Sequence, residues 1–234
     1  SIAKVLGSEE LDWTVDELVQ VHGGYGYIAE FPAERAYRDA RINRIWEGTN
    51  EINRLLVPGT LVKRAMQGRL DLLGPAKRAA DALLGGAADE APGGGPLAAE
   101  AALVAGARTA SLLCAGAAFQ RFGTGIEEQQ EVLADLADIA IDLFAAESAL
   151  LRAQAAAGRG DAEVHADLAR VVVHDRAAAV EARARALAPA LAEGDEARML
   201  QSGVRRLMRT DPVDRVALGR RVAERVVAAG GYPV

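Results

Sequence analysis

The sequence of 234 residues has one cysteine, three histidines, few aromatic residues and no excess of positive charge. The lone cysteine, Cys114, excludes an internal disulfide and fits a reducing compartment. A net charge of −6 excludes the basic surface that collects nucleic acid or anionic membranes. Neither a long uninterrupted apolar run nor a charged-then-apolar leader is present, so we expect no transmembrane segment and a cytoplasmic protein.

The usual signatures of metal sites and activated nucleophiles are also missing. His165 and His174 lie on opposite faces of one predicted helix, which favours surface or helix-capping histidines over metal ligands. Cys114 stands among small apolar residues in "ASLLCAGAAF", and this context favours a core residue over a nucleophile. No Gly-x-Ser-x-Gly elbow occurs. Spacing and local context therefore disfavour a metal site and an activated thiol or serine nucleophile.

Alanine, leucine, arginine and glutamate dominate the chain, and these residues lose little on entering a helix, so we predict an all-α fold. In the first part, apolar spacing predicts a helix over 2–21. Pro32, placed in a first turn, favours a short polar helix over 32–39. Alternation over 42–46 suggests an extended segment. Thr49 is a good N-cap for the next helix, which Pro58 and Gly59 should break or kink.

The stretch 85–96, "GGAADEAPGGGP", is rich in glycine and proline and divides the chain. We expect a first helical domain over 1–84, a linker over 85–96 and a second helical bundle over 97–234. Apolar residues at steps of three and four mark one bundle helix, and further helices are predicted near 161–192, 195–209 and 213–229. Asp161 is the expected cap of the first of these.

Glycines interrupt the helical pattern in "HGGYGY", residues 22–27. The motif follows a helix rather than a strand, so it does not match the nucleotide-binding fingerprint of a βαβ unit. Taken alone it favours a turn between two helices. Glycine nevertheless lets the backbone come close to a ligand, with bare N–H groups available to phosphate oxygens.

A second unusual motif is "RIWEGTNEI", in which Glu47 stands between Trp46 and Gly48. If Trp46 and Ile45 bury the carboxylate, desolvation raises its pKa and makes it a candidate general base. A helix-capping or ion-paired glutamate is an equally good interpretation of this motif alone. The nearby arginines at positions 35, 38, 41 and 44 alternate with acids, which favours a salt-bridged face over a phosphate clamp.

Three motifs taken together point to a family. The order and spacing of "QVHGGYGY", "ERAYRDARI" and "RIWEGTNEINRL" closely resemble the carboxy-terminal helical domain of the acyl-CoA dehydrogenases. The later stretch "EEQQEVLADLADIAIDLFAAESALLRA" and the closing "VAERVVAAGGYPV" resemble the additional helical domain of the very-long-chain branch. The resemblance covers essentially the whole chain, more loosely after residue 70.

This resemblance implies an FAD-dependent conversion of a long-chain acyl-CoA to a trans-2-enoyl-CoA in fatty acid β-oxidation. It implies that Glu47 removes the α-proton and that Gly48 lines the thioester site. It also implies that an electron-transfer flavoprotein accepts the electrons and that the enzyme is a homodimer or homotetramer. The residues implied to contact FAD form two segments: Gln20, Val21, His22, Gly23 and Gly24, often facing a neighbouring subunit's flavin, and Thr49, Asn50 and Glu51. We expect the flavin at the glycine turn to lie close to Glu47.

The resemblance also implies an amino-terminal helical domain and a central β-domain, to which nothing in this sequence corresponds. We therefore expect the isolated chain neither to hold FAD tightly nor to turn over substrate. Two alternatives remain open. One is an acyl-CoA oxidase-like flavoenzyme, which passes electrons to oxygen. The other is a non-catalytic helical module that drives oligomerisation, in which Glu47 has no chemical role.

Overall fold

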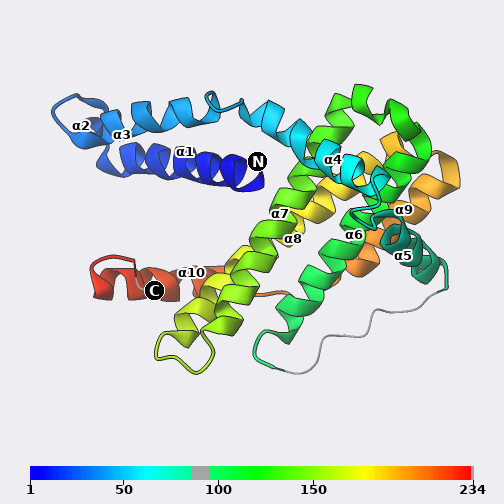
Figure 1. Ribbon diagram of the computed structural model, residues 1–234. Coiled ribbons are helices and arrows are strands. Elements are labelled where there is room, and N and C mark those ends of the chain that lie inside the picture. The colour runs from blue at the N-terminus through cyan, green and yellow to red at the C-terminus, as the bar shows by residue number, and fades with distance from the viewer. Residues whose placement is uncertain (86–94, 233–234) are drawn as a thin grey trace.

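The computed structural model describes residues 1–85 and 95–232, and these residues form helices joined by turns, with no β-strand among them (Figure 1). The predicted all-α fold is confirmed. Residues 86–94, which make up most of the expected linker, lie outside the described part of the chain.

The first part of the chain is a helical arm made of α1 (Ile2–His22), α2 (Gly24–Tyr27), α3 (Pro32–Arg41) and the 3-10 turn η1 (Ile42–Arg44). α1 packs against α3, and Figure 1 shows the arm projecting from the rest of the molecule with α2 at its tip. Gly23, at φ 59°, ends α1 because its backbone adopts a left-handed conformation that side chains disfavour.

The helix α4 (Asn50–Met66) leads from the arm to the bundle and packs on α7 (Gln130–Ala155). Thr49 is its N-cap, as expected, and the Thr49 hydroxyl accepts a hydrogen bond from the Ile52 N–H. Of the expected break or kink at Pro58, the break does not occur, because α4 continues through this residue. Pro58 is buried at this helix contact, and packing there outweighs the lost backbone hydrogen bond.

The remaining helices form the bundle. They are α5 (Leu73–Gly85), α6 (Ala98–Phe122), η2 (Gly123–Glu128), α7, α8 (Ala162–Leu191), α9 (Gly194–Leu207) and α10 (Arg215–Ala229). The core between α6, α7 and α8 contains many alanines, which let the helix backbones approach closely. Cys114 is fully buried in this core, and burial raises the pKa of its thiol to about 12. It is the core residue that the sequence predicted.

Length and composition alone would let one described helical segment, Ala98–Glu128, cross a membrane, although the sequence led us to expect no such segment. Its mean hydropathy reaches 1.5 over its most apolar window, and 44% of that window is buried inside the protein. The segment packs against α7, α8 and α9 (Figure 1). A core helix of a bundle passes the same test, so the finding is weak evidence for a membrane span.

Two other local expectations are wrong. Residues 42–44 form the 3-10 turn η1 instead of an extended segment, and the Ile45 N–H bonds back to the Ile42 carbonyl at 2.9 Å. His165 is buried, and the imidazole of His174 is largely buried, instead of lying at the surface. Their Nε2 atoms face Asp161 at 3.4 Å and Glu100 at 3.6 Å, respectively. Asp161 does occupy the N-cap position of α8, although its side chain makes no capping hydrogen bond.

Candidate functional site

Glu47 occupies a strained turn between η1 and α4. Its φ is +54°, and among the described residues it is the only one other than glycine with a positive φ. Gly48 follows at φ +78°. A left-handed conformation costs an ordinary L-residue roughly 1–2 kcal/mol, so surrounding contacts must hold Glu47 in place. Such outliers gather at functional sites, and this one falls on the predicted base.

Two side chains hold this turn through its carbonyl groups. The Asn53 side-chain Nδ2 donates to the carbonyl oxygens of Gly48 at 2.8 Å, Thr49 at 3.1 Å and Glu47 at 3.4 Å. The Lys4 ammonium, from the start of α1, donates to the Gly48 carbonyl at 2.9 Å. The turn is thus fixed both from within α4 and from the neighbouring helix.

The predicted cofactor residue Asn50 is committed to contacts inside the protein. It is only 1% exposed. Its Oδ1 accepts from the Lys4 ammonium at 2.6 Å, while its Nδ2 donates to the Ser8 hydroxyl at 2.9 Å and to the Glu9 carboxylate at 3.1 Å. Asn50 therefore ties the start of α4 to α1, and its amide does not point to solvent.

The other residues of the second predicted FAD segment lie nearer the surface. Thr49 caps α4, and Glu51 is exposed in the first turn of that helix. Hydrogen bonds from its own backbone N–H and from the Thr49 side chain lower the pKa of the Glu51 carboxyl. A carboxylate at a helix N-terminus also gains from the helix dipole.

The Glu47 side chain is exposed in this chain. Trp46 is 54% exposed and Ile45 is 50% exposed, so the expectation that they bury the carboxylate is wrong. The Trp46 indole Nε1 donates to the Asn43 Oδ1 at 3.1 Å, which ties the ring to η1. Among the described residues the Glu47 carboxylate makes no ion pair, which argues against the ion-paired interpretation of this motif.

The glycine-rich turn presents the first predicted FAD segment to solvent. Gln20, Val21, His22, Gly23 and Gly24 are all exposed, and Val21 is 82% exposed. The His22 ring Nδ1 lies 2.8 Å from the Leu18 carbonyl oxygen, which fixes the ring against α1. A side chain on Gly26 would place its Cβ 2.4 Å from the Val19 carbonyl oxygen, so only glycine lets α2 fold back this closely.

A groove of about 790 Å³ lies beside this turn. Its lining includes Gly26 and Tyr27 of α2 and Arg38 and Arg41 of α3. Arg38 pairs with Glu34 at 3.7 Å, whereas Arg41 has no ion partner in the part of the chain that the structure describes. The salt-bridged interpretation of the arginines thus holds for Arg38. It also holds for the arginine at position 44, whose partner is Asp12 at 2.7 Å.

The two predicted segments lie at opposite ends of α1. Lys4 and Ser8, near its start, contact the Glu47 region, whereas Gln20 and His22 lie near its end (Figure 1). At 1.5 Å per residue, the helix separates these ends by roughly 20 Å. Within one chain the α1–α3 hairpin therefore holds the two segments apart. That a bound flavin lies close to Glu47 stays a prediction.

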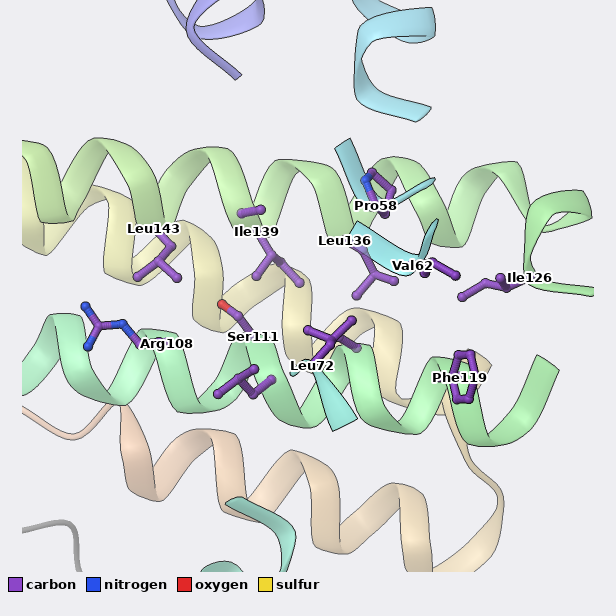
Figure 2. Close-up of a pocket in the computed structure, with 13 residues that line it drawn as sticks. Pro58, Val62, Leu72, Arg108, Ser111, Phe119, Ile126, Leu136, Ile139 and Leu143 are labelled. Carbon is purple, nitrogen blue, oxygen red and sulfur yellow. The ribbon is translucent and has the colours of Figure 1, made fainter. Parts of the chain in front are cut away.

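A separate apolar cavity of about 150 Å³ lies inside the bundle, away from both segments (Figure 2). Figure 2 shows Leu136, Ile139 and Leu143 of α7 facing Ser111 and Phe119 of α6. No group of three or more potential metal ligands occurs within 1–85 and 95–232. The apolar cavity therefore offers no candidate catalytic group, and the candidate base lies at the Glu47 turn.

Sequence reasoning missed the side chains that support this turn. Lys4, Ser8, Glu9 and Arg54 converge on the start of α4 although they are distant in sequence from the residues they bind. No local pattern marks them. The only hint of these supporting side chains in the sequence is that charged residues interrupt helix faces that pack against other helices.

Comparisons with known proteins agree with this architecture. Two family models match the chain, over residues 1–61 and 106–206, and both are described as the acyl-CoA dehydrogenase C-terminal domain. A probable acyl-CoA dehydrogenase from Bacillus subtilis is 42% identical over 100% of this chain and 40% of its own length. The crystal structure of an acyl-CoA dehydrogenase complexed with FAD from Bacillus anthracis superposes with a TM-score of 0.95 at 42% identity, again over 100% of this chain and 40% of that chain.

A second relative is similar over a shorter stretch of the chain. The pig mitochondrial short-chain specific acyl-CoA dehydrogenase is 49% identical over 63 residues, which are 27% of this chain and 15% of that protein. The fold and the turn define a class of protein, an all-helical domain with the Glu47 carboxylate exposed on a fixed turn. Together with the comparisons, they show that the chain belongs to the acyl-CoA dehydrogenase family. It spans 40% of the length of the relatives that match it throughout.

Proposed function

We propose that this chain forms the carboxy-terminal helical part of an FAD-dependent acyl-CoA dehydrogenase, with Glu47 as the catalytic base. The observation that carries the proposal is the left-handed backbone of Glu47, which hydrogen bonds from Asn53 and Lys4 hold in place. A turn that only connected two helices would be more stable with glycine at this position. The strained glutamate indicates that its carboxylate is needed there.

The residues at the glycine turn fit part of a flavin dinucleotide. A Cβ added to Gly23 or to Gly24 would meet no heavy atom within 4 Å, so a ligand can approach their backbone. The adjacent groove holds about 790 Å³ and includes Arg41, which is available to a phosphate. Residues 20–24 would contact the FAD of a neighbouring subunit, and Thr49 and Glu51 would contact FAD at the start of α4. Asn50, whose amide is bonded inside the protein, would support this segment from behind. When bound, FAD supplies the two-electron acceptor for the reaction.

Glu47 would take the α-proton of an acyl-CoA thioester onto a carboxylate oxygen. Gly48 adjoins it without a side chain, which leaves room for the thioester next to the base. Because the carboxylate is exposed here, the water-free environment that proton abstraction requires has to come from surfaces outside this chain. We infer that the isolated chain provides the base and its support, and that the substrate pocket is completed elsewhere.

Finer features of the activity follow from the same resemblance. We propose a long-chain acyl-CoA as the substrate, β-oxidation as the process, an electron-transfer flavoprotein as the acceptor and a homodimer or homotetramer as the assembly. Support for the long-chain class comes from the bundle that follows the arm, since the short-chain relative matches only 27% of this chain. If the full-length enzyme instead forms one hydrogen peroxide for each acyl-CoA consumed, the acyl-CoA oxidase alternative is favoured.

The test of the base is Glu47→Gln in the full-length holoenzyme, assayed with palmitoyl-CoA and an artificial electron acceptor. We expect turnover to fall by roughly 10² to 10⁴ while flavin absorbance per protein is unchanged. Glu30→Gln, which changes an exposed carboxylate in the α2–α3 loop, is the matched control and should retain full turnover. Equal turnover in both variants would reject the assignment and favour a non-catalytic helical module.

A second experiment uses the 234-residue chain alone. We expect it to purify colourless and to reduce no acceptor with palmitoyl-CoA, since the two FAD segments lie at opposite ends of one helix. A yellow preparation with stoichiometric flavin and turnover would show that this chain is sufficient by itself.

A further inference from the structure

Arg54 of α4 joins three helices through its guanidinium group. Its Nε donates to Asp138 Oδ1 of α7 at 2.7 Å. Its two terminal nitrogens donate to the two carboxylate oxygens of Glu9, on α1, at 2.8 and 2.9 Å. One planar guanidinium thus donates to a carboxylate of the bundle and to a carboxylate of the arm at the same time. A lysine ammonium lacks the fork of nitrogens that this geometry requires.

The hydrogen bonds continue from Glu9 to the Glu47 turn. Glu9 Oε1 accepts from Asn50 Nδ2 at 3.1 Å, and Asn50 Oδ1 accepts from the Lys4 ammonium at 2.6 Å. Lys4 then donates to the Gly48 carbonyl at 2.9 Å. We define the relay as this connected set: Asp138, Arg54, Glu9, Asn50 and Lys4.

Three members of the relay, Asn50, Arg54 and Asp138, are well shielded, whereas the Glu9 side chain is 37% exposed. The side chains of Arg54 and Asp138 are 17% and 15% exposed. Burial raises the pKa of the Glu9 carboxyl, but hydrogen bonds from Arg54 and Asn50 more than reverse this and leave the pKa below its ordinary value. The hydrogen bond with Glu9 likewise raises the pKa of Arg54. In a partly buried network, losing one partner leaves the others under-satisfied.

We propose that the bundle positions the catalytic turn through this relay, with Arg54 and Asp138 as positioning residues for Glu47. The inference rests on the proposed function, because it assumes that Glu47 is the base. It assigns the bundle a role in the reaction beyond packing. Glu47 is held against its own backbone preference, so its orientation depends on the groups that grip the Gly48 carbonyl. Loosening the far end of the relay lets Lys4 and the turn move.

Asp135 provides a matched control for Asp138. It lies one turn earlier on α7 and also faces Arg183, at 3.8 Å, whereas Asp138 is 3.1 Å from the same arginine. Asp135 makes no contact with Arg54. Replacing either aspartate by alanine removes one carboxylate of α7 that faces Arg183. Only the change at Asp138 also removes the hydrogen bond to Arg54 of α4.

The first experiment measures amide hydrogen exchange in the 234-residue chain, with no cofactor or substrate. The N–H groups of Trp46 and Asn53, which donate to Ile42 and Thr49, report on the two sides of the turn. In Asp138→Ala we expect exchange in residues 42–53 to become about tenfold faster, with no change in Asp135→Ala. Asp138→Asn keeps an acceptor oxygen for Arg54 and should restore most of the protection. Equal exchange in the two alanine variants would overturn the relay.

The second experiment measures turnover of the same variants in the full-length holoenzyme. Asp138→Ala should lower kcat about tenfold while KM for palmitoyl-CoA and the flavin content stay the same, and the isotope effect of α-deuterated substrate should rise. A lower melting temperature with normal kcat would mean that Asp138 only stabilises the fold. If Asp138→Ala does not fold, Arg54→Lys, which keeps the charge but loses the fork, takes its place with the same expected results.

The two proposals fail separately. If Glu47→Gln keeps its turnover, the base assignment falls, whatever hydrogen exchange shows. If Glu47→Gln is inactive while Asp138→Ala matches Asp135→Ala in both exchange and kcat, the base stands and the relay falls.

Discussion

The side-chain amide of Asn53 donates a hydrogen bond of 2.8 Å to the carbonyl oxygen of Gly48. The same nitrogen reaches the carbonyls on either side, so one amide closes the turn that carries Glu47. Gly48 has a φ of +78°, which favours glycine, and a Cβ there would also lie only 3.1 Å from this nitrogen. The conformation of the base thus depends on an asparagine six residues later in the chain.

Removing this amide tests its role. Asn53→Ala should lower the free energy of unfolding by about 1–3 kcal/mol, because the turn carbonyls lose a donor. Urea denaturation of the 234-residue chain measures the change. Asn43→Ala is the control, since Asn43 donates to the Ala40 carbonyl at 3.0 Å and makes no hydrogen bond to the carbonyls of residues 47–49. The two variants should differ in hydrogen exchange at residues 47–49, and equal exchange there would contradict the role given to Asn53.

The strain at Glu47 predicts an unusual effect of glycine on stability. Glu47→Gly and Glu47→Ala both remove the carboxylate, yet only glycine adopts φ +54° without steric cost. We expect the glycine variant to be more stable than the alanine variant by about 1 kcal/mol, although glycine usually destabilises a chain. Thermal and urea unfolding of the two variants measure this difference. A more stable alanine variant would show that the backbone at Glu47 is not strained in solution.

Glu9 makes the relay sensitive to acid. Its folded-state pKa lies below the ordinary glutamate value, so its charge stabilises the fold at and above a pH of about 4.3. That contribution is lost as the pH falls through the lowered folded-state pKa. Glu9→Gln should therefore reduce the unfolding free energy more at pH 7 than at pH 3. Urea midpoints at the two pH values give the comparison. A larger loss at pH 3 would contradict the sign.

The sequence predicted the helices well where capping and periodicity act locally. Thr49 caps α4 as expected, and Asp161 stands at the expected N-cap position of α8. Tertiary packing decided the failures. Pro58 stays inside α4 because α7 covers it, and His165 is buried because α8 turns that face toward the core. Neither effect can be read from neighbouring residues.

The candidate site was predicted only in part, for the same reason. Motif spacing identified Glu47 and the glycine turn as the residues of interest. It could not predict that Glu47 would be exposed and left-handed, because the turn is held by contacts with α1, which is distant in sequence. The link from Asp138 to Arg54 joins residues far apart in the sequence, and no local pattern encodes such a pairing.

A close helix contact in the bundle gives the last prediction. A Cβ at Gly106 of α6 would lie 2.2 Å from the backbone carbonyl oxygen of Leu207, at the end of α9. A backbone atom cannot rotate away, so Gly106→Ala has to push the helices apart. We expect a loss of about 1–3 kcal/mol in unfolding free energy, as for other overpacked cores.

Gly219 provides the comparison for Gly106. It lies inside α10 and is exposed, and a Cβ added there would meet no heavy atom within 4 Å. Gly219→Ala should leave the unfolding free energy unchanged or raise it by up to about 1 kcal/mol, because alanine favours the helix without a clash. Urea unfolding of both variants, followed by circular dichroism, decides the matter. If Gly106→Ala proves as stable as Gly219→Ala, α6 and α9 cannot be packed as closely as the structure shows.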